Sequence, residues 1–267
     1  VQTLLHLSTL AEGGGFSSLR AQAVLESDAQ RAQLIAETVA QMRRGGYGGV
    51  DVDFEFLGAE LADAFAGFLG ELRAAVHAAG GTVVCALAPK TSAEQRGVLY
   101  EGHDYRRIGE NADAVLLMTY EWGYTYGPPM AVAPIGAVRR VVEYALTQIP
   151  ASKILLGFPN YAYDWTLPYA AGESRARSLG NEAAAALAVQ VGAEIRFDET
   201  AQTPYFSYTD RTGAAHEVWF EDARSCAAKY DLAQEYSLRG FGFWNFMRPF
   251  TAAFALLNAR FTILPGV

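Results

Sequence analysis

Basic residues and long apolar runs are scarce in this 267-residue sequence. Lys and Arg total 21 against 29 Asp and Glu, which leaves a net charge of −8. Phosphate binding depends on clustered Lys and Arg, so this balance argues against nucleic acid or an anionic membrane as partner. No apolar run approaches the length of a transmembrane helix, and the first residues show no signal-peptide pattern. We therefore expect no membrane insertion, and the charge is compatible with a neutral polymer or a small substrate.

The residues that metal and disulfide chemistry require are also few. The two cysteines, Cys85 and Cys226, give neither a disulfide framework nor a metal-ligand spacing. Cys85 lies in an apolar strand-like run, where we expect it to be a small buried hydrophobe. The four histidines show no paired ligand spacing. No metal site and no cofactor are predicted.

What the sequence does have is apolar residues in a regular order. They make up 51% of the chain, enough for a substantial core. Strand-like runs cover residues 4–8, 50–56, 82–88, 114–120, 154–158 and 240–245. Helical periodicity fills most of the connections, at about 28–44, 61–79, 136–148 and 222–238. Alternation of this sort predicts parallel βαβ units, hence a barrel or a doubly wound sheet. Polar residues at the carboxyl ends of the strands favour the barrel, since a (β/α) barrel gathers its catalytic groups at that rim.

The alternation breaks between about Tyr163 and Glu221. This stretch holds a helix starting near Asn181 and three strand-like runs, two of which flank a predicted hairpin turn at Asp210–Gly213. We therefore predict three segments: a first barrel part at 1–162, a small α+β insertion at 163–221, and a last barrel part at 222–267. The chain also opens directly inside an apolar run, so we expect further residues upstream of Val1.

The most informative segment is the acidic run from Gly48 to Phe56. Side chains in a strand alternate between faces, so Asp51, Asp53 and Glu55 share one face and the apolar residues between them share the other. Three partly buried acids at a rise of about 6.6 Å per two residues cannot all stay ionised. We expect Glu55, nearest the rim, to be a neutral acid around pH 6 to 7 that protonates a leaving group. In the alternative, purely structural interpretation, these acids cap neighbouring loops or pair with Lys and Arg side chains.

This acidic run resembles the strand motif of glycoside hydrolase family 18, the chitinase-like (β/α)8 hydrolases. Leu117–Gly123 resembles the Met-x-Tyr-Asp strand end of that family, Ile154–Tyr161 its next strand, and Gly240–Asn245 its final strand with a Trp. The sequences of residues 118–135 and 244–250 are most similar to those of the spore cortex-lytic branch. Its members are peptidoglycan N-acetylglucosaminidases of germination that often carry LysM repeats, so the resemblance also implies LysM modules as partners.

Several positions depart from the family pattern. Gly48 replaces the first Asp of the acidic motif, Phe54 replaces the Trp before the Glu, and Glu121 stands where the family has Asp. The run at 4–8 resembles the third strand of the family barrel. The first two βα units of the barrel are therefore expected to be absent from this chain.

The resemblance implies a substrate-assisted retaining mechanism, in which the 2-acetamido oxygen of the substrate is the nucleophile. Glu55 would protonate the glycosidic oxygen and then activate water. Asp53 would orient the acetamido group, Asp51 would share a proton with Asp53, and Tyr120 would hydrogen-bond the acetamido oxygen.

The resemblance also implies a set of substrate-binding side chains. These are Glu121, Trp244, Met118, Asn160, Tyr161 and Trp122. Glu121 would bind sugar hydroxyls, Trp244 would form the floor under the sugar, and Met118 would pack at the base of the pocket. The other three would lie on the rim, or would only hold loops. Lys90 would meet a substrate carboxylate or would be a solvated loop charge.

The predicted function is hydrolysis of β-1,4 bonds in an N-acetylglucosamine-containing polymer, with cortex peptidoglycan as the substrate. The resemblance places such an enzyme outside the cytoplasm, in the cell wall or the spore cortex or coat. Three alternatives differ in class or substrate: a sugar-binding lectin on the same barrel, a chitinase acting on chitin oligomers, and an unrelated barrel whose acids bind a metal.

Overall fold

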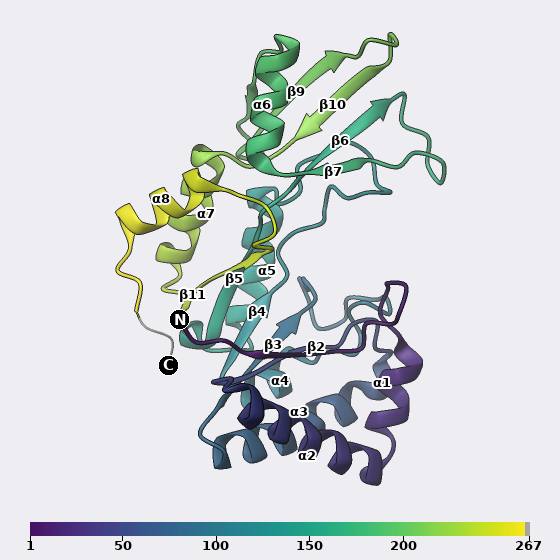
Figure 1. Ribbon diagram of the computed structural model, residues 1–267, viewed down its shortest axis with the longest axis vertical. Coiled ribbons are helices and arrows are strands. Elements are labelled where there is room, and N and C mark those ends of the chain that lie inside the picture. Colours follow the sequence, from purple (N-terminus) through teal and green to yellow (C-terminus); the bar gives the residue numbers. More distant parts are fainter. Residues whose placement is uncertain (265–267) are drawn as a thin grey trace.

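The main sheet of the computed structural model, which describes residues 1–264, has six parallel strands (Figure 1). Their order is β1-β2-β3-β4-β5-β11. Their bounds are β1 (Leu5–Ser8), β2 (Gly49–Asp53), β3 (Thr82–Leu87), β4 (Ala114–Leu117), β5 (Ile154–Pro159) and β11 (Gly240–Trp244). Within residues 1–264, β1 and β11 are the two edges. All six predicted strands are confirmed, and their carboxyl ends meet at one edge of the sheet.

Helices follow most of these strands and cover the sheet. They are α1 (Ser18–Leu25), α2 (Asp28–Gly45), α3 (Ala62–Ala78), α4 (Tyr105–Asn111), α5 (Ile135–Leu146), α7 (Ala223–Glu235) and α8 (Thr251–Arg260), with short 3-10 turns at Ala59–Leu61 and Ala151–Lys153. The Ser27 side chain caps α2 by accepting from the Gln30 amide, and Gly46 ends it with a φ of 66°. No helix in residues 1–264 is both long and apolar enough to cross a bilayer.

The apolar side of β2 is buried in the core between the helices and the sheet. Val50 and Val52 are fully buried and Phe54 is 2% exposed. The Phe54 ring stacks on Phe65 and Phe68 of α3, at centroid distances of 5.6 and 5.5 Å. The apolar side of the acidic run therefore packs on a helix, as the alternation predicts, and the acids take the other side.

A second sheet lies between β5 and β11 in the sequence and above the main sheet in Figure 1. Its five antiparallel strands follow the order β7-β6-β10-β9-β8. They are β6 (Ala162–Leu167), β7 (Arg177–Leu179), β8 (Arg196–Asp198), β9 (Thr203–Thr209) and β10 (Ala215–Trp219), with α6 (Asn181–Val191) packed on one face. The predicted turn at Asp210–Gly213 joins β9 to β10. The strands β6 and β7 were not predicted: Ala162 to Trp165 in β6 are all buried and show no alternation, and β7 has only three residues.

Candidate active site

A pocket of about 170 Å³ opens at the carboxyl ends of β2, β3 and β4. Its lining consists of Glu55, Pro89, Leu99, Tyr100, Met118, Tyr120, Glu121 and Trp122. Glu55 follows β2, Pro89 follows β3, and Met118 to Trp122 follow β4. Two motifs that lie more than sixty positions apart in the sequence thus share one pocket, because parallel strands bring their carboxyl ends together.

The three acids of the motif rise toward this pocket. Asp51 and Asp53 belong to β2, and Glu55 comes two residues after Asp53, beyond the end of the strand. All three are half-buried, while the apolar residues between them are buried. The strand was predicted to continue to Phe56, but it ends at Asp53. Phe56 then turns the chain away with a φ of 56°.

The reason that β2 ends early is a buried histidine. The His103 ring is fully buried, and burial lowers its pKa to about 4, so the ring is neutral. Its Nδ1 accepts from the Ala88 amide at 2.9 Å. Its Nε2 must then carry the hydrogen and donate to the Phe54 carbonyl oxygen, also at 2.9 Å. This bond replaces a strand partner and fixes the backbone immediately before Glu55.

Burial shifts the titration of Glu55. Burial first, and then the charges of Asp53 and Glu121, together raise the pKa of this carboxyl to about 7. A carboxylic acid with such a pKa keeps its proton in a large fraction of molecules at neutral pH. That is the requirement for a general acid near pH 7.

Asp53 is shifted in the same direction by the same cause. Burial raises its pKa, the charge of His6 lowers it and the charge of Asp51 raises it, and together they give a pKa of about 6. One buried oxygen of Asp53, Oδ1, has no hydrogen-bond partner among the described residues. A buried oxygen without a partner is uncommon, and it could accept from a ligand N–H once the side chain turns toward the pocket.

His6 is a member of this cluster that sequence reasoning missed. It lies opposite Asp51 in the register of β1 and β2. Its Nδ1 is 2.8 Å from Asp51 Oδ2, and this hydrogen bond raises the pKa of the imidazole. The signal that identifies it is the pairing of β1 with β2, which requires aligning two strands that are far apart in the chain.

The wall opposite the acids is aromatic. Burial, and then the charges of Asp53 and Glu55, raise the pKa of Tyr120, so its hydroxyl stays protonated. The Tyr120 ring meets Tyr161 edge-on at 6.5 Å between centroids. Tyr163, another residue that the sequence did not single out, donates through its hydroxyl to Glu121 Oε1 at 2.9 Å.

Glu121 has a strained backbone. Its φ is 68°, a left-handed conformation that is uncommon for residues other than glycine. The next residue holds this turn, because the Trp122 amide donates to the Val132 carbonyl oxygen at 3.1 Å. Strain of this kind concentrates at functional sites, and here it orients Glu121 into the pocket lining.

Three of the predicted substrate contacts, Asn160, Tyr161 and Trp244, lie outside the pocket lining in the part of the chain that the structure describes. Asn160 is fully buried and donates through Nδ2 to the carbonyl oxygens of Asn245 and Arg248, at 2.8 and 2.7 Å. It therefore holds the loop after β11. Trp244 is 51% exposed at the end of β11, and the Asn160 amide donates to its carbonyl oxygen.

Lys90 has neither of the roles that the sequence suggested. It is 4% exposed, and its ammonium donates to the His103 carbonyl oxygen at 3.0 Å. It is therefore not a solvated loop charge, and it does not point at a ligand. Cys85 is fully buried, as predicted. Among residues 1–264 no group of three or more His, Cys, Asp or Glu is placed to hold a metal ion.

Comparison with known proteins assigns this geometry to a family. The model of the glycosyl hydrolases family 18 matches residues 4–248. The cortical fragment-lytic enzyme of Bacillus subtilis (strain 168) is 46% identical over 98% of this chain and 61% of its own length. The spore cortex-lytic enzyme SleL of Bacillus megaterium QM B1551 has a crystal structure with a TM-score of 0.96 and 40% identity, covering 100% of this chain and 61% of that one. A chitinase from Chromobacterium violaceum ATCC 12472 has a TM-score of 0.88 and 27% identity, covering 97% and 79%.

The chain spans about three-fifths of the length of the first two relatives. The likeness extends over all the described strands and confirms the predicted fold class, a chitinase-like (β/α) barrel with an α+β insertion before the last strand. With a family model that matches most of its length, the chain belongs to glycosyl hydrolase family 18.

Proposed function

We propose that this chain is the catalytic part of a glycoside hydrolase that cleaves β-1,4 bonds in an N-acetylglucosamine-containing polymer, with spore cortex peptidoglycan as its substrate. Family membership supports the reaction class. The names of the cortical fragment-lytic and spore cortex-lytic relatives support the substrate. The proposal includes action in the cell wall or spore cortex, and LysM modules as partners.

The observation that carries the proposal is the state of Glu55. Its carboxyl lies in the lining of a pocket, two residues beyond a buried strand, with a pKa raised by burial to about 7. In this scheme it gives its proton to the glycosidic oxygen as the bond to the sugar breaks. As a carboxylate it then takes a proton from the water that completes hydrolysis.

Asp53 and Asp51 serve the second half of the scheme. The nucleophile is the acetamido oxygen of the substrate itself. Asp53, whose Oδ1 has no partner among the described residues, turns toward the acetamido N–H, accepts its hydrogen bond and offsets the positive charge of the cyclic intermediate. Asp51, which is hydrogen-bonded to His6, shares a proton with Asp53.

The remaining contacts position the sugar. Tyr120 keeps its proton and donates to the acetamido oxygen, and Glu121 accepts from sugar hydroxyls. Met118 and Trp122 form the apolar lining of the pocket, and Tyr161 supports the Tyr120 ring. Trp244 offers its exposed ring to the apolar face of a pyranose. We further propose that the insertion, residues 163–221, walls one side of the substrate path.

The test compares the wild type with Glu55→Gln on purified cortex fragments and on chitin oligomers, with new reducing ends identified by mass. We expect the wild type to cleave cortex fragments, and the variant to lose most turnover while it keeps its fold and sugar binding. Binding without turnover by the wild type would favour the lectin alternative. Cleavage of chitin oligomers in preference to cortex would favour the chitinase alternative.

A further inference from the structure

The pocket around Glu55 carries negative charge without a basic residue in its described lining. Glu55 and Glu121 line it, and Asp51 and Asp53 lie beneath. Lys90 points inward. Like charges at short range repel, most strongly where water is partly excluded. A substrate that carries carboxylates therefore needs a cation somewhere else along its path.

Arg175 is placed to supply that cation. It is exposed in the connection between β6 and β7, and its guanidinium carbon lies 5.7 Å from the centroid of the Tyr126 ring, within cation–π range. The next residue, Ala176, donates through its amide to the Thr125 carbonyl oxygen at 2.7 Å. Thr125 and Tyr126 belong to the loop that starts at Glu121 in the pocket wall. Arg175 is thus attached to the loop that leaves the active site.

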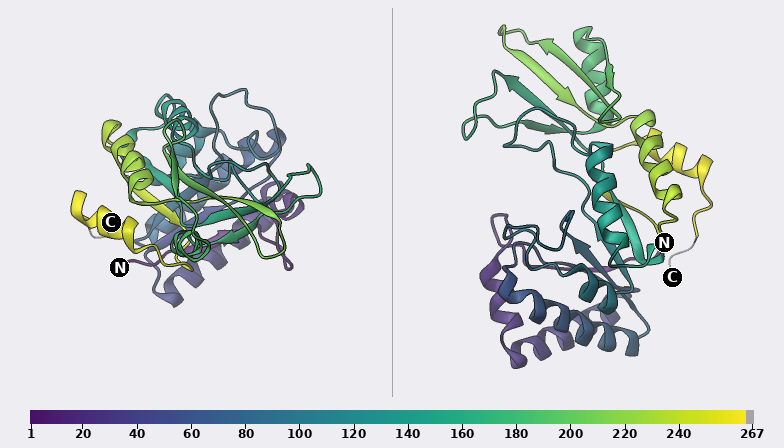
Figure 2. Two further views of the ribbon diagram at one scale, coloured as in Figure 1. Left: turned by 90° about the horizontal axis from the view of Figure 1, so that it is seen from above. Right: turned by 180° about the vertical axis from the view of Figure 1, so that it is seen from behind.

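The position of Arg175 lies within reach of a polymer bound at the pocket. Five residues span at most about 18 Å when fully extended, which bounds the distance along the chain from Glu121 to Tyr126. The connection between β6 and β7 lies on the same side of the molecule as the loops that follow β1 and β3 (Figures 1 and 2). A glycan that extends beyond the pocket on this side meets this rim.

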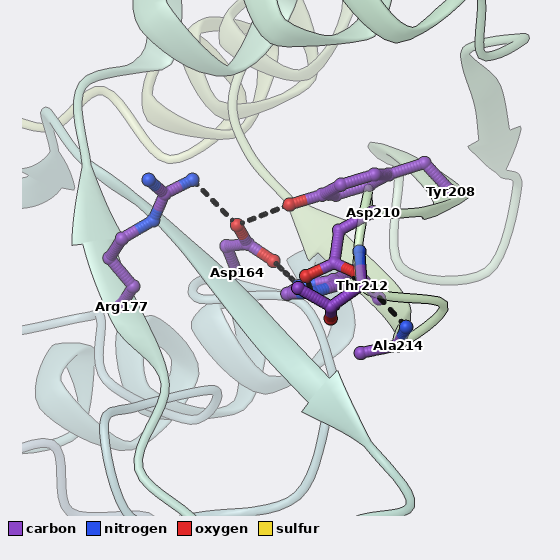
Figure 3. Close-up of polar contacts among 7 residues, drawn as sticks. Asp164, Arg177, Tyr208, Asp210, Thr212 and Ala214 are labelled. Atoms are coloured by element: carbon purple, nitrogen blue, oxygen red, sulfur yellow. Dashed lines mark hydrogen bonds and ion pairs between the residues drawn. The ribbon is translucent and has the colours of Figure 1, made fainter.

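Other charges near Arg175 are already paired. They border a second pocket, of about 300 Å³, which Arg175 also lines. Asp164 is 3% exposed; its Oδ2 accepts from Arg177 at 2.7 Å and from the Tyr208 hydroxyl at 3.0 Å. Its Oδ1 lies 2.8 Å from His216 Nδ1. Figure 3 shows this network around the Asp164 carboxylate. Asp164 is therefore satisfied without Arg175.

The second acid of this pocket is also occupied. Asp210 Oδ1 accepts from the amides of Thr212 and Ala214 at 2.8 and 2.9 Å, as Figure 3 also shows. Glu173, the acid nearest to Arg175 in the sequence, is exposed. Within residues 1–264 the ion pairs of this pocket join Arg177 and His216 to their acids and do not include Arg175.

We propose that Arg175 binds a carboxylate of the substrate and so favours a glycan with acidic peptide substituents over a neutral one. This inference rests on the proposed function. A guanidinium recognises a carboxylate through two parallel N–H bonds, and it can stack on an aromatic ring while its N–H groups remain available. Tyr126 holds the group in place, so less conformational freedom is lost when the carboxylate binds.

The experiment measures binding in the Glu55→Gln background, so that turnover does not interfere. The ligands are a muropeptide with free carboxylates, prepared from peptidoglycan, and a neutral N-acetylglucosamine tetramer. Arg175→Gln is compared with Arg211→Gln, which removes the same charge from the exposed turn between β9 and β10. We expect Arg175→Gln to raise the Kd of the muropeptide about two- to fivefold. The Kd of the tetramer should not change, and the difference should shrink at high salt.

Three results would overturn the role of Arg175: an unchanged muropeptide Kd, equal weakening of both ligands, or the same loss in Arg211→Gln. The proposed function is decided separately, by turnover of the enzyme with Glu55 intact. If that enzyme cleaves neither polymer the proposed function fails, while the binding comparison still decides whether Arg175 recognises carboxylates.

Discussion

His6 and Asp51 are register partners on adjacent parallel strands, and their side chains meet with Nδ1 2.8 Å from Oδ2. The imidazole is held beside Asp51, the acid farthest from the pocket, and its charge lowers the pKa of Asp53, whereas burial raises it. The hydrogen bond to Asp51 raises the pKa of His6 itself. One basic group thus offsets part of the repulsion among three acids.

His6→Gln should therefore move the acidic limb of the kcat/KM profile. Without the imidazolium charge the pKa of Asp53 rises above about 6. The ionised form is then reached at higher pH, and the limb shifts upward by about 0.2 to 0.7 pH units. His77→Gln is a matched control, since His77 Nε2 lies 2.8 Å from Asp113 Oδ2 near the amino end of β3, whereas the pocket lies at its carboxyl end. A limb that stays in place or moves downward would contradict the electrostatic role of His6.

Trp244→Ala should weaken substrate binding without loss of fold. The ring is 51% exposed, so its removal leaves no cavity in the core. If a sugar stacks on it, KM should rise about two- to tenfold while kcat changes little. Phe246→Ala is the control, because Phe246 is also exposed but its ring stacks on Phe254. Equal KM values for wild type and Trp244→Ala would remove Trp244 from the site.

The buried pair of Lys229 and Glu221 should dominate the stability of the region between the two sheets. Both side chains are buried, and Nζ lies 2.8 Å from Oε2. Lys229→Met leaves a carboxylate buried without its counter-charge, which costs about 3 to 5 kcal/mol. Burial already raises the pKa of Glu221, so the variant folds with a protonated Glu221, and its deficit grows as pH rises above the unfolded pKa.

Urea denaturation of Lys229→Met and of the double variant Lys229→Met/Glu221→Gln checks this interpretation. The double variant also removes the Glu221 carboxyl, which the single variant leaves buried without a cation, and it should recover part of the lost free energy of unfolding. If it is no more stable than the single variant, the cost comes from packing around Lys229 instead.

The sequence predicted the main strands because parallel strands buried on both faces read as short apolar runs. It predicted the acid stack because alternation alone places Asp51, Asp53 and Glu55 on one side. It could not identify His6 or Tyr163 as site residues. The contact of His6 with Asp51 depends on the register of β1 against β2, and Tyr163 bonds Glu121, a residue 42 positions earlier in the chain. It also extended β2 to Phe56, since nothing local shows that His103 takes the Phe54 carbonyl.

The fate of Lys90 has a similar cause. Its neighbours Pro89 and Thr91 read as a loop, which favours an exposed charge. The structure instead folds its ammonium back onto the His103 carbonyl oxygen. Hydrogen bonds between the residues at the start of α4 and Ala88, just after β3, bring this partner near. The cation that we propose for a substrate carboxylate, Arg175, lies in the β6–β7 connection, where the sequence shows only a single arginine in a loop-like segment.

The account depends most directly on the protonation of Glu55, and a titration of that carboxyl tests it. Carboxyl ¹³C shifts of labelled glutamates, with Glu55→Gln to assign the resonance, give the pKa without substrate. We expect a value of about 7, set first by burial and then by Asp53 and Glu121. The alkaline limb of kcat/KM should fall at the same pH, because the acid is lost as pH rises. A Glu55 pKa near the ordinary value of about 4.3 would contradict the assignment of this residue as the general acid.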